Sequence, residues 1–155
     1  MLTVIVLALV LIFLSVAVHS AIIILSIQSV RGRLNAPSIT RVWPSLILLS
    51  RFFVVLLASH LMQATLWAIV YIAIGQMARL EQAVYFSMTS YTTVGYGDEL
   101  LKGPLRLLGP IEAATGILMF GWSTALTVAL FARMLHGPYP FIGISGRAHD
   151  PSGDL

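Results

Sequence analysis

Three long apolar stretches constrain the fold of this chain more than any other feature. The first, from Thr3 to Ile27, is almost unbroken Val, Ile, Leu and Ala; the second runs from Leu46 to Gly75, and the third from about Leu105 to Leu135. A helix of about 20 apolar residues is long enough to cross the hydrocarbon layer of a membrane. We therefore predict an all-α membrane protein with three transmembrane helices.

The composition excludes several other classes of protein. Of the 155 residues, 58% are hydrophobic and only 10% are charged, which is far from the balance of a soluble domain. The nine Lys and Arg residues are scattered, so nucleic acid is not an expected partner. No Cys is present, which removes thiolate metal sites and Cys nucleophiles. We expect membrane lipid around the chain and no small-molecule substrate.

The first apolar stretch, residues 3–29, has two interpretations. A signal peptide has a short apolar region that follows basic residues, whereas here no Lys or Arg precedes an apolar run of greater length. We therefore expect a retained first transmembrane helix.

The distribution of basic residues predicts the orientation. Six Arg residues lie between the first two spans, just inside the second, or after the third: Arg31, Arg33, Arg41, Arg51, Arg133 and Arg147. Only three basic residues lie on the other side of the membrane: Arg79, Lys102 and Arg106. Because cytoplasmic segments are enriched in Lys and Arg, residues 30–43 are expected to be a cytoplasmic basic loop. The Gly- and Pro-rich residues 136–155 are expected to form a flexible cytoplasmic tail. The N-terminus is then outside, in a multi-pass protein of the plasma (inner) membrane.

A shorter helix is predicted between the second and third spans. Glu81 to Thr92 could form three helical turns, which is too short to cross a membrane. Such a re-entrant helix is stable only where protein or water surrounds it.

The next residues, Thr92 to Asp98, are suited to bind a dehydrated cation. Such an ion needs oxygen atoms on all sides, and a backbone offers a column of carbonyls only if its dihedrals alternate in hand. Gly95 and Gly97 adopt positive φ without steric cost and alternate with Val94 and Tyr96. Four copies on an axis would stack the carbonyls of residues 93–96 in layers, together with the Thr93 hydroxyl.

At these residues the chain resembles a known family. Thr93-Val94-Gly95-Tyr96-Gly97 is similar to the selectivity filter of potassium channels, and Asp98 extends the similarity to the form found in bacterial and two-pore-type members. The resemblance implies a homotetramer that conducts K⁺ ions passively, with K⁺ bound by Thr93, Val94, Gly95 and Tyr96. Residues 44–135 would be the pore domain, with outer helix, pore helix, filter loop and inner helix.

The third span resembles the inner helix of simple two-span channels over Thr115 to Ala125. This implies that Gly116 is a gating hinge, that Phe120 packs under the filter and that Thr124 faces the cavity. Close helix packing is the alternative role of Gly116. The lower part of the helix, around Ala125, Leu126, Ala129 and Phe131, could narrow into a hydrophobic gate.

Two positions near the filter depart from the family pattern. Many members hydrogen-bond the Asp after the filter through a Trp of the pore helix, and here Tyr85 is the only comparable donor to Asp98. The best-known bacterial member has a Glu in the pore helix beside that Asp, where this chain has Thr89. We expect Tyr85, Thr89 and Asp98 to support the filter.

Glu112, in the third span, is the least expected residue, because an ionisable group at such depth is costly. It could brace the pore helix through the hydroxyls of Thr89, Ser90 or Tyr91. Alternatively, it is a carboxylate near the outer mouth, wetted or paired with Arg106.

His19 and His60 also lie within spans, at similar expected depth. They could form a pH-sensing pair. Alternatively, they only hydrogen-bond neighbouring helices, for example through Ser15, Ser59 or Gln63.

Four other functions compete with a potassium channel. A weakly selective cation channel usually lacks the Gly-Tyr-Gly triplet that is intact here, and a potassium transporter repeats a degenerate filter four times in one chain. A non-conducting structural or regulatory membrane subunit remains open. An enzyme is not expected, because His, Asp and Glu are spread over both membrane faces.

Overall fold

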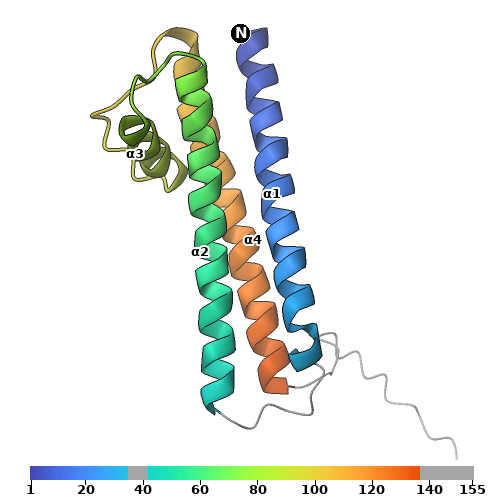
Figure 1. The fold of residues 1–155 in the computed structure, drawn as a ribbon. Coiled ribbons are helices and arrows are strands. Elements are labelled where there is room, and N and C mark those ends of the chain that lie inside the picture. Colours follow the sequence, from blue (N-terminus) through green and yellow to red (C-terminus); the bar gives the residue numbers. More distant parts are fainter. Residues whose placement is uncertain (35–41, 137–155) are drawn as a thin grey trace, which may run out of the picture.

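The computed structural model describes residues 1–34 and 42–136, and every element in these ranges is helical. The elements are α1 (Leu2–Leu34), α2 (Val42–Ala73), α3 (Leu80–Tyr91), the 3-10 helix η1 (Gly103–Leu107) and α4 (Leu108–His136). The long helices α1, α2 and α4 lie alongside one another, and α3 packs on the outside of α2 and α4 (Figure 1). The predicted flexible tail, beyond residue 136, lies outside the described residues.

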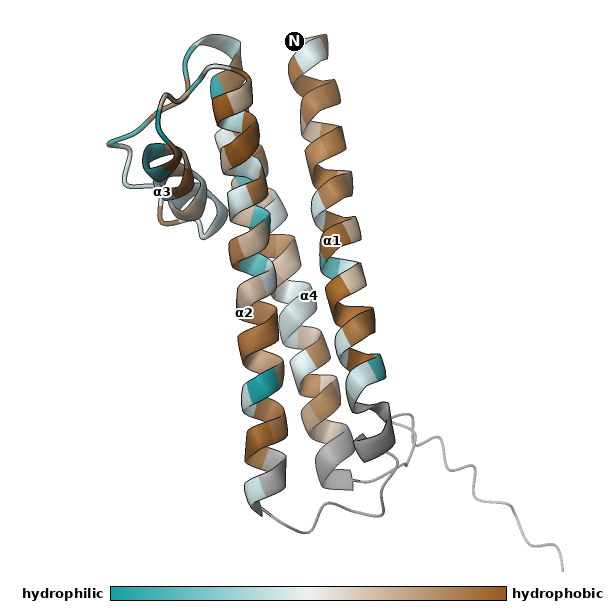
Figure 2. Cartoon of the chain, viewed as in Figure 1, coloured by the Kyte–Doolittle hydropathy of each residue, from teal (hydrophilic) through white to brown (hydrophobic). Residues whose placement is uncertain are grey.

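The three predicted spans are confirmed as helices long and apolar enough to cross a membrane, over Leu2–Ser29, Leu46–Ala73 and Gly103–Ala132. Hydrophobic residues, coloured brown, predominate along all three helices (Figure 2). Two helices extend further than expected: α1 continues past residue 29 to Leu34, and α2 begins at Val42. The predicted basic loop is therefore shortened to residues 35–41, which lie outside the described residues.

The start of the third span differs from the prediction. The sequence predicts a single helical span from about Leu105. Instead η1 precedes α4, with Pro104 in its first residues, and α4 begins at Leu108. Pro110 therefore falls in the first turn of α4, where its missing N–H has no helical partner to lose.

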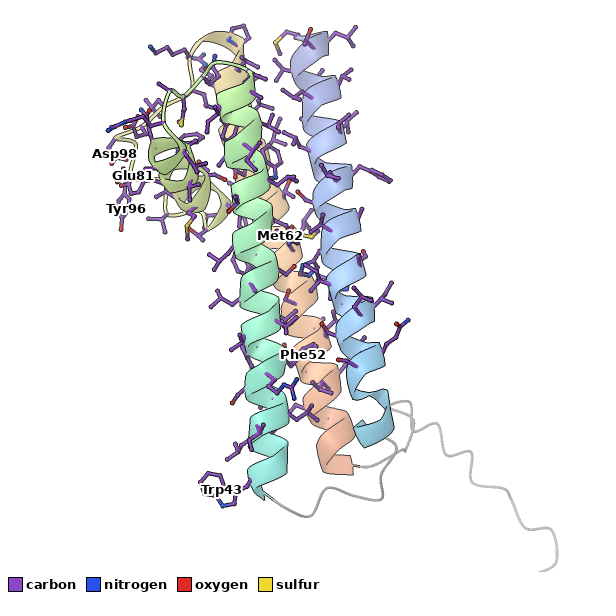
Figure 3. The ribbon with its side chains drawn as sticks, viewed as in Figure 1. Trp43, Phe52, Met62, Glu81, Tyr96 and Asp98 are labelled. Carbon is purple, nitrogen blue, oxygen red and sulfur yellow. The ribbon has the colours of Figure 1, made fainter. Side chains whose placement is uncertain are left out.

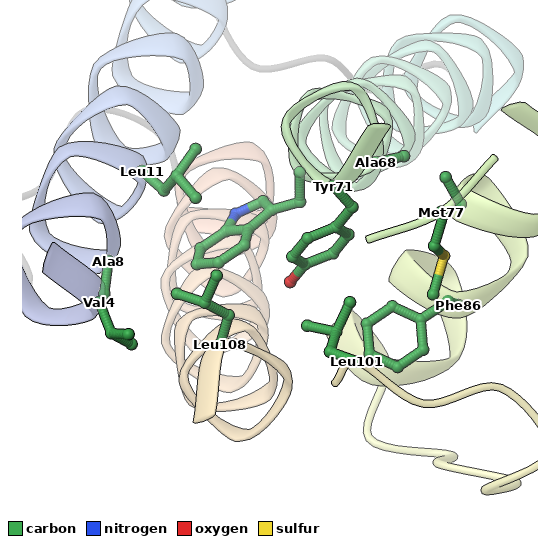
Figure 4. Close-up of a cluster of buried hydrophobic side chains, with 11 residues drawn as sticks. Val4, Ala8, Leu11, Ala68, Tyr71, Met77, Phe86, Leu101 and Leu108 are labelled. Atoms are coloured by element: carbon green, nitrogen blue, oxygen red, sulfur yellow. The ribbon is translucent and has the colours of Figure 1, made fainter. Parts of the chain in front are cut away.

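The largest apolar cluster lies at the end of the bundle that holds the N-terminus, and it joins all four α-helices. Tyr71 of α2 lies between Leu11 of α1 on one side and Phe86 of α3 on the other (Figure 4), and the buried Trp67 belongs to the same cluster. Phe86 brings α3 into the cluster, and Leu108 brings in the start of α4. These contacts fix the short helix against the bundle, and they therefore position the loop that follows it.

Candidate ion-binding loop and its supports

The short helix α3 matches the prediction to within one residue at each end. Its buried side chains, Ala83, Phe86, Ser87 and Tyr91, are spaced three and four residues apart, so they form one face that packs on α2 and α4. Glu81 lies in the first turn, where the positive pole of the helix favours a carboxylate. The helix closes at Thr92, whose N–H donates to the carbonyl of Met88 at 3.0 Å.

The loop after α3 has the alternating backbone that the sequence predicts. Gly95 and Gly97 have φ of 54° and 79°, and among the described non-glycine residues only Thr93 has a positive φ, of 64°. Positive φ thus occurs at residues 93, 95 and 97, with Val94 and Tyr96 between them. The left-handed region costs about 1–3 kcal/mol for a residue such as Thr. The surrounding structure must therefore hold Thr93 in place.

Two backbone hydrogen bonds hold the loop against the end of α3. The N–H of Thr93 donates to the Ser90 carbonyl at 2.9 Å, and the N–H of Gly95 donates to the Thr89 carbonyl at 3.0 Å. Thr89 therefore contacts the loop through its backbone. Its hydroxyl is directed elsewhere and donates to the Phe86 carbonyl at 2.9 Å.

The side chains from Thr92 to Asp98 are all exposed on the single chain. The aromatic ring of Tyr96 stacks on that of Tyr85 in α3, with centroids 6.5 Å apart and planes 10° from parallel. Tyr96 and Asp98 both project on the side of the molecule away from α1 (Figure 3). One chain alone therefore leaves this loop uncovered.

The carboxylate after the loop is tied back to α3 as the sequence suggests. Tyr85 Oη donates to Asp98 Oδ2 at 2.8 Å, and this hydrogen bond raises the pKa of the Tyr85 hydroxyl above its ordinary value. A second link was not foreseen: Gln82 Nε2 donates to Glu99 Oε2 at 2.7 Å. Since Gln82 and Tyr85 are three residues apart, they lie on one face of α3, a spacing that could have revealed the pair.

Glu112 of α4 is fully buried and braces α3, though not through the hydroxyls that were expected. Tyr71 Oη of α2 donates to its Oε2 at 2.7 Å, and the hydroxyl of Ser87 in α3 contacts its Oε1. The predicted partners Thr89, Ser90 and Tyr91 are wrong. The alternative of a wetted carboxylate at the outer mouth, paired with Arg106, is also wrong, because both oxygens are buried against hydroxyls.

Gly116 marks the closest approach of α4 to α3. A Cβ atom there would lie 1.9 Å from the carbonyl oxygen of Tyr91, the last residue of α3. Gly109, seven residues earlier, faces the same helix, since its Cβ would lie 3.3 Å from Phe86 Cζ. This geometry supports the close-packing role of Gly116, and its role as a hinge stays a prediction.

The remaining predicted residues of α4 lie beneath α3 and along the exposed part of the helix. Phe120 packs under the end of α3, with its ring centroid 5.6 Å from that of Tyr91. Thr124 and Ala125 are exposed, as is Phe131 further down. The Thr124 hydroxyl donates to the Phe120 carbonyl at 2.8 Å. Their assignment to a cavity and a gate stays a prediction.

His19 and His60 are buried close together, with imidazole centroids 5.2 Å apart. His19 contacts Ser59 and Gln63, two of the suggested partners. Both imidazoles also contact Ser123, and His60 contacts Tyr91, neither of which the sequence identified. His60 is buried in the bundle and does not point to lipid, an orientation that would have excluded pH sensing. The pH-sensing hypothesis therefore stays a prediction.

No side-chain metal site accompanies the loop. Within residues 1–34 and 42–136, no three His, Cys, Asp or Glu side chains are grouped so that they could hold a metal ion. Besides the side chains of Thr92, Tyr96 and Asp98, the loop carries its backbone carbonyls and the Thr93 hydroxyl as oxygens.

Comparison with known proteins agrees with this geometry. A family model described as ion channel (Ion_trans_2) matches residues 46–133, which is more than half of the chain and includes α2, α3, the loop and most of α4. No curated protein and no solved structure matches the chain. The match leaves out α1. On the strength of the family model, this chain is a membrane protein that belongs to the ion channel family, whose members are not enzymes.

Proposed function

We propose that this chain is one subunit of a homotetrameric channel that conducts K⁺ passively and selectively. The observation that carries the proposal is the backbone of residues 93–97, in which positive φ alternates along the sequence Thr-Val-Gly-Tyr-Gly. This loop follows a helix too short to span the membrane and lies inside the part of the chain that matches ion channels.

K⁺ suits such a loop because backbone carbonyls can replace its hydration shell. The carbonyls of Thr93, Val94, Gly95 and Tyr96, with the Thr93 hydroxyl, are the proposed ligands, and Gly97 completes the filter. The C-terminal end of α3 carries the negative pole of the helix and favours a cation in the space below the loop.

The exposed surfaces of the single chain support assembly into a tetramer. Val94 in the loop is 52% exposed, and Leu118 and Val128 of α4 are 67% and 58% exposed. One loop cannot surround an ion, whereas four loops around an axis can. We assign part of the exposed surface of α4 to contacts between subunits and part to the wall of the pore.

The expected orientation is also a proposal. The N-terminus and the loop lie near the same end of the bundle, and the opposite end holds the end of α1, the start of α2 and the end of α4 (Figure 1). Six of the nine Lys and Arg residues lie in the last turns of α1 and α4, in the first three turns of α2, or in the sequence beyond these ends, so we place this end in the cytoplasm of a plasma (inner) membrane. The N-terminus and the filter would then face outward.

The test is K⁺ and Na⁺ flux into liposomes that contain the purified full chain. We expect flux that is selective for K⁺ and blocked by Ba²⁺, and we expect Thr93→Cys to lose or alter it. Equal K⁺ and Na⁺ flux would indicate a weakly selective cation channel. Absence of flux over a range of pH, voltage and lipid would contradict the proposal in favour of a non-conducting subunit.

A further inference from the structure

Five polar side chains meet in the middle of the apolar bundle, one or more from each α-helix. They are His19 of α1, His60 and Gln63 of α2, Tyr91 of α3 and Ser123 of α4, and each is at most 6% exposed. Hydrophilic patches interrupt the hydrophobic surface of α1 and α2 near mid-height (Figure 2). Unpaired polar groups in such a place are costly. Among the side chains that the structure describes, however, every buried nitrogen and oxygen has a partner.

The backbone carbonyl of Ser59 fixes the direction of these hydrogen bonds. Gln63 Nε2 lies 3.3 Å from that carbonyl oxygen, which can only accept, so the amide must present its NH₂ group there. The same NH₂ group lies 3.1 Å from His19 Nδ1, and the Ser59 hydroxyl lies 2.9 Å from that nitrogen, so Nδ1 faces two groups that can donate to it. His19 therefore carries its own hydrogen on Nε2.

The remaining bonds then follow around a closed path. His19 Nε2–H donates to Ser123 Oγ at 3.1 Å, and Ser123 donates to His60 Nε2 at 3.0 Å. His60 Nδ1–H donates to Tyr91 Oη at 3.1 Å, and Tyr91 donates to Gln63 Oε1 at 3.0 Å. Gln63 returns to His19. Each of the five side chains donates once and accepts once around this hydrogen-bond ring, in which both imidazoles are neutral.

The hydrogen-bond ring acts on the residue from which the filter loop departs. Tyr91 is the last residue of α3 and stands two positions before the strained Thr93. The ring holds its hydroxyl, while Gly116 contacts its carbonyl oxygen from the other side. Rotation or sliding of α3 would have to break one of these contacts.

We propose that His19 and Ser123 are positioning residues for the filter, and that α1 thereby takes part in ion selection. They act through His60 and Gln63, which hold Tyr91 and so fix where the loop of Thr93 begins. This inference rests on the proposed channel function. It goes beyond that function because α1 lies outside the residues that match the ion channel family.

Acid should open the hydrogen-bond ring. The titratable groups within it are His19 from α1, His60 from α2 and Tyr91 from α3, and α4 contributes the neutral Ser123. The buried carboxyl on α4 is Glu112, eleven residues before Ser123 and thus about 16 Å away along the helix. A proton added to His19 Nδ1 would face the Gln63 NH₂ group. A proton added to His60 Nε2 would displace the hydrogen that Ser123 donates to that nitrogen. Either proton breaks one bond of the ring.

The decisive comparison is Ser123→Ala against Ser15→Ala. Ser15 Oγ accepts from Trp67 Nε1 at 3.1 Å, so it is an equally buried hydroxyl that joins α1 to α2 outside the ring. Both variants remove one hydroxyl and both should lower the unfolding temperature. Only Ser123→Ala should increase amide hydrogen exchange at residues 92–97 and reduce the K⁺/Na⁺ flux ratio, by about fivefold in each case. Ser123→Thr, which keeps a hydroxyl, should behave as the wild type.

Hydrogen exchange keeps this test separate from the test of the channel. If the wild-type chain carries no K⁺, the proposed function fails, and exchange at residues 92–97 still decides whether the ring positions the loop. Equal exchange in the two variants would show a merely structural role and overturn the inference. If Ser123→Ala does not fold, Tyr91→Phe removes a ring hydroxyl and keeps the aromatic contact with Phe120. That variant should show the same change, and lowering the pH should produce it in the wild type once exchange is corrected for the slower intrinsic rate of amide exchange in acid.

Discussion

Glu112 is held by a set of hydrogen bonds that suits an uncharged carboxyl group. The Ser87 hydroxyl has one hydrogen but lies against two acceptors, the Ala64 carbonyl and the Glu112 carboxyl. All groups are satisfied if Glu112 itself carries a hydrogen, donates it to Ser87 and leaves Ser87 to donate to Ala64. Tyr71 then donates to the other carboxyl oxygen. At this residue the bundle contains a neutral bridge between three helices.

The first prediction follows from that bridge. Glu112→Gln should keep the fold, because an amide can donate to Ser87 and accept from Tyr71, whereas Glu112→Leu should destabilise it by about 1–3 kcal/mol since both partners lose their bonds. Thermal unfolding of the purified protein measures the difference. If Glu112→Gln cost as much as Glu112→Leu, an ionised carboxylate would be required and the neutral bridge would be wrong.

A second prediction concerns Tyr85 and Asp98. Tyr85→Phe should reduce the K⁺/Na⁺ flux ratio and keep the stacking with Tyr96, because only the hydroxyl is removed. Asp98→Asn should have a similar effect, and the double variant should be no worse than either single one. Effects that simply add would mean that the two residues support the loop separately.

The same bond has a defined pH dependence. The pKa of Tyr85 is raised by its bond to Asp98, so the hydroxyl form is favoured in the folded protein. Its contribution to stability is fully present below the ordinary tyrosine value of about 10 and is lost as the pH rises through the raised value.

Between elements, the contact of α3 with α4 depends on glycine. Gly116→Ala should destabilise the protein by about 1–3 kcal/mol, because the new Cβ would overlap the Tyr91 carbonyl and force the helices apart. Gly121→Ala is the matched control: it lies in the same helix with nothing within 4 Å of its Cβ, and alanine favours helices. Thermal unfolding should separate the two variants. A hinge with no packing role would leave the stability of Gly116→Ala unchanged and alter only gating.

The helices themselves could be predicted from the sequence, but their mutual contacts could not. The number of spans and the existence of α3 follow from the lengths of the apolar runs, since the bilayer sets a minimum length. The partners of Glu112 depend on how α2, α3 and α4 are rotated about their axes. Helices that are apolar on nearly all sides give little signal for that rotation. For this reason Ser87 and Tyr71 were missed, although Ser87 shares a face of α3 with Ala83 and Tyr91.

The contact between Tyr85 and Asp98 was more accessible to sequence reasoning. Both residues lie within a short stretch whose resemblance to a known loop fixes their relative positions. Only part of the hydrogen-bond ring could be predicted from the sequence. Gln63 is close to His60 in sequence, as is Ser59, which contacts His19, whereas Ser123 is distant. A chain taken alone does not reveal which buried serine on a third helix will face two histidines.

At the scale of the whole molecule, the loop and the surface of α4 that are exposed on the single chain are the surfaces that the proposed tetramer would bury. We expect native mass spectrometry of the protein in mild detergent to give four copies of the 16.9 kDa chain. In the proposed tetramer, van der Waals packing of Val94 and of the apolar side chains of α4 between subunits would favour association, since lipid provides no hydrophobic driving force between helices. A monomer or a dimer that still conducts K⁺ selectively would contradict the proposed assembly, since fewer than four loops cannot enclose the ion.

The left-handed backbone at Thr93 places two demands on one residue. Glycine would relax the strain at a φ of 64°, but it would remove the hydroxyl oxygen proposed to bind the ion. Stability and discrimination between ions therefore favour different amino acids at this position. A laboratory selection for heat resistance alone should recover Thr93→Gly. The selected protein should be more stable to heat but less selective among ions.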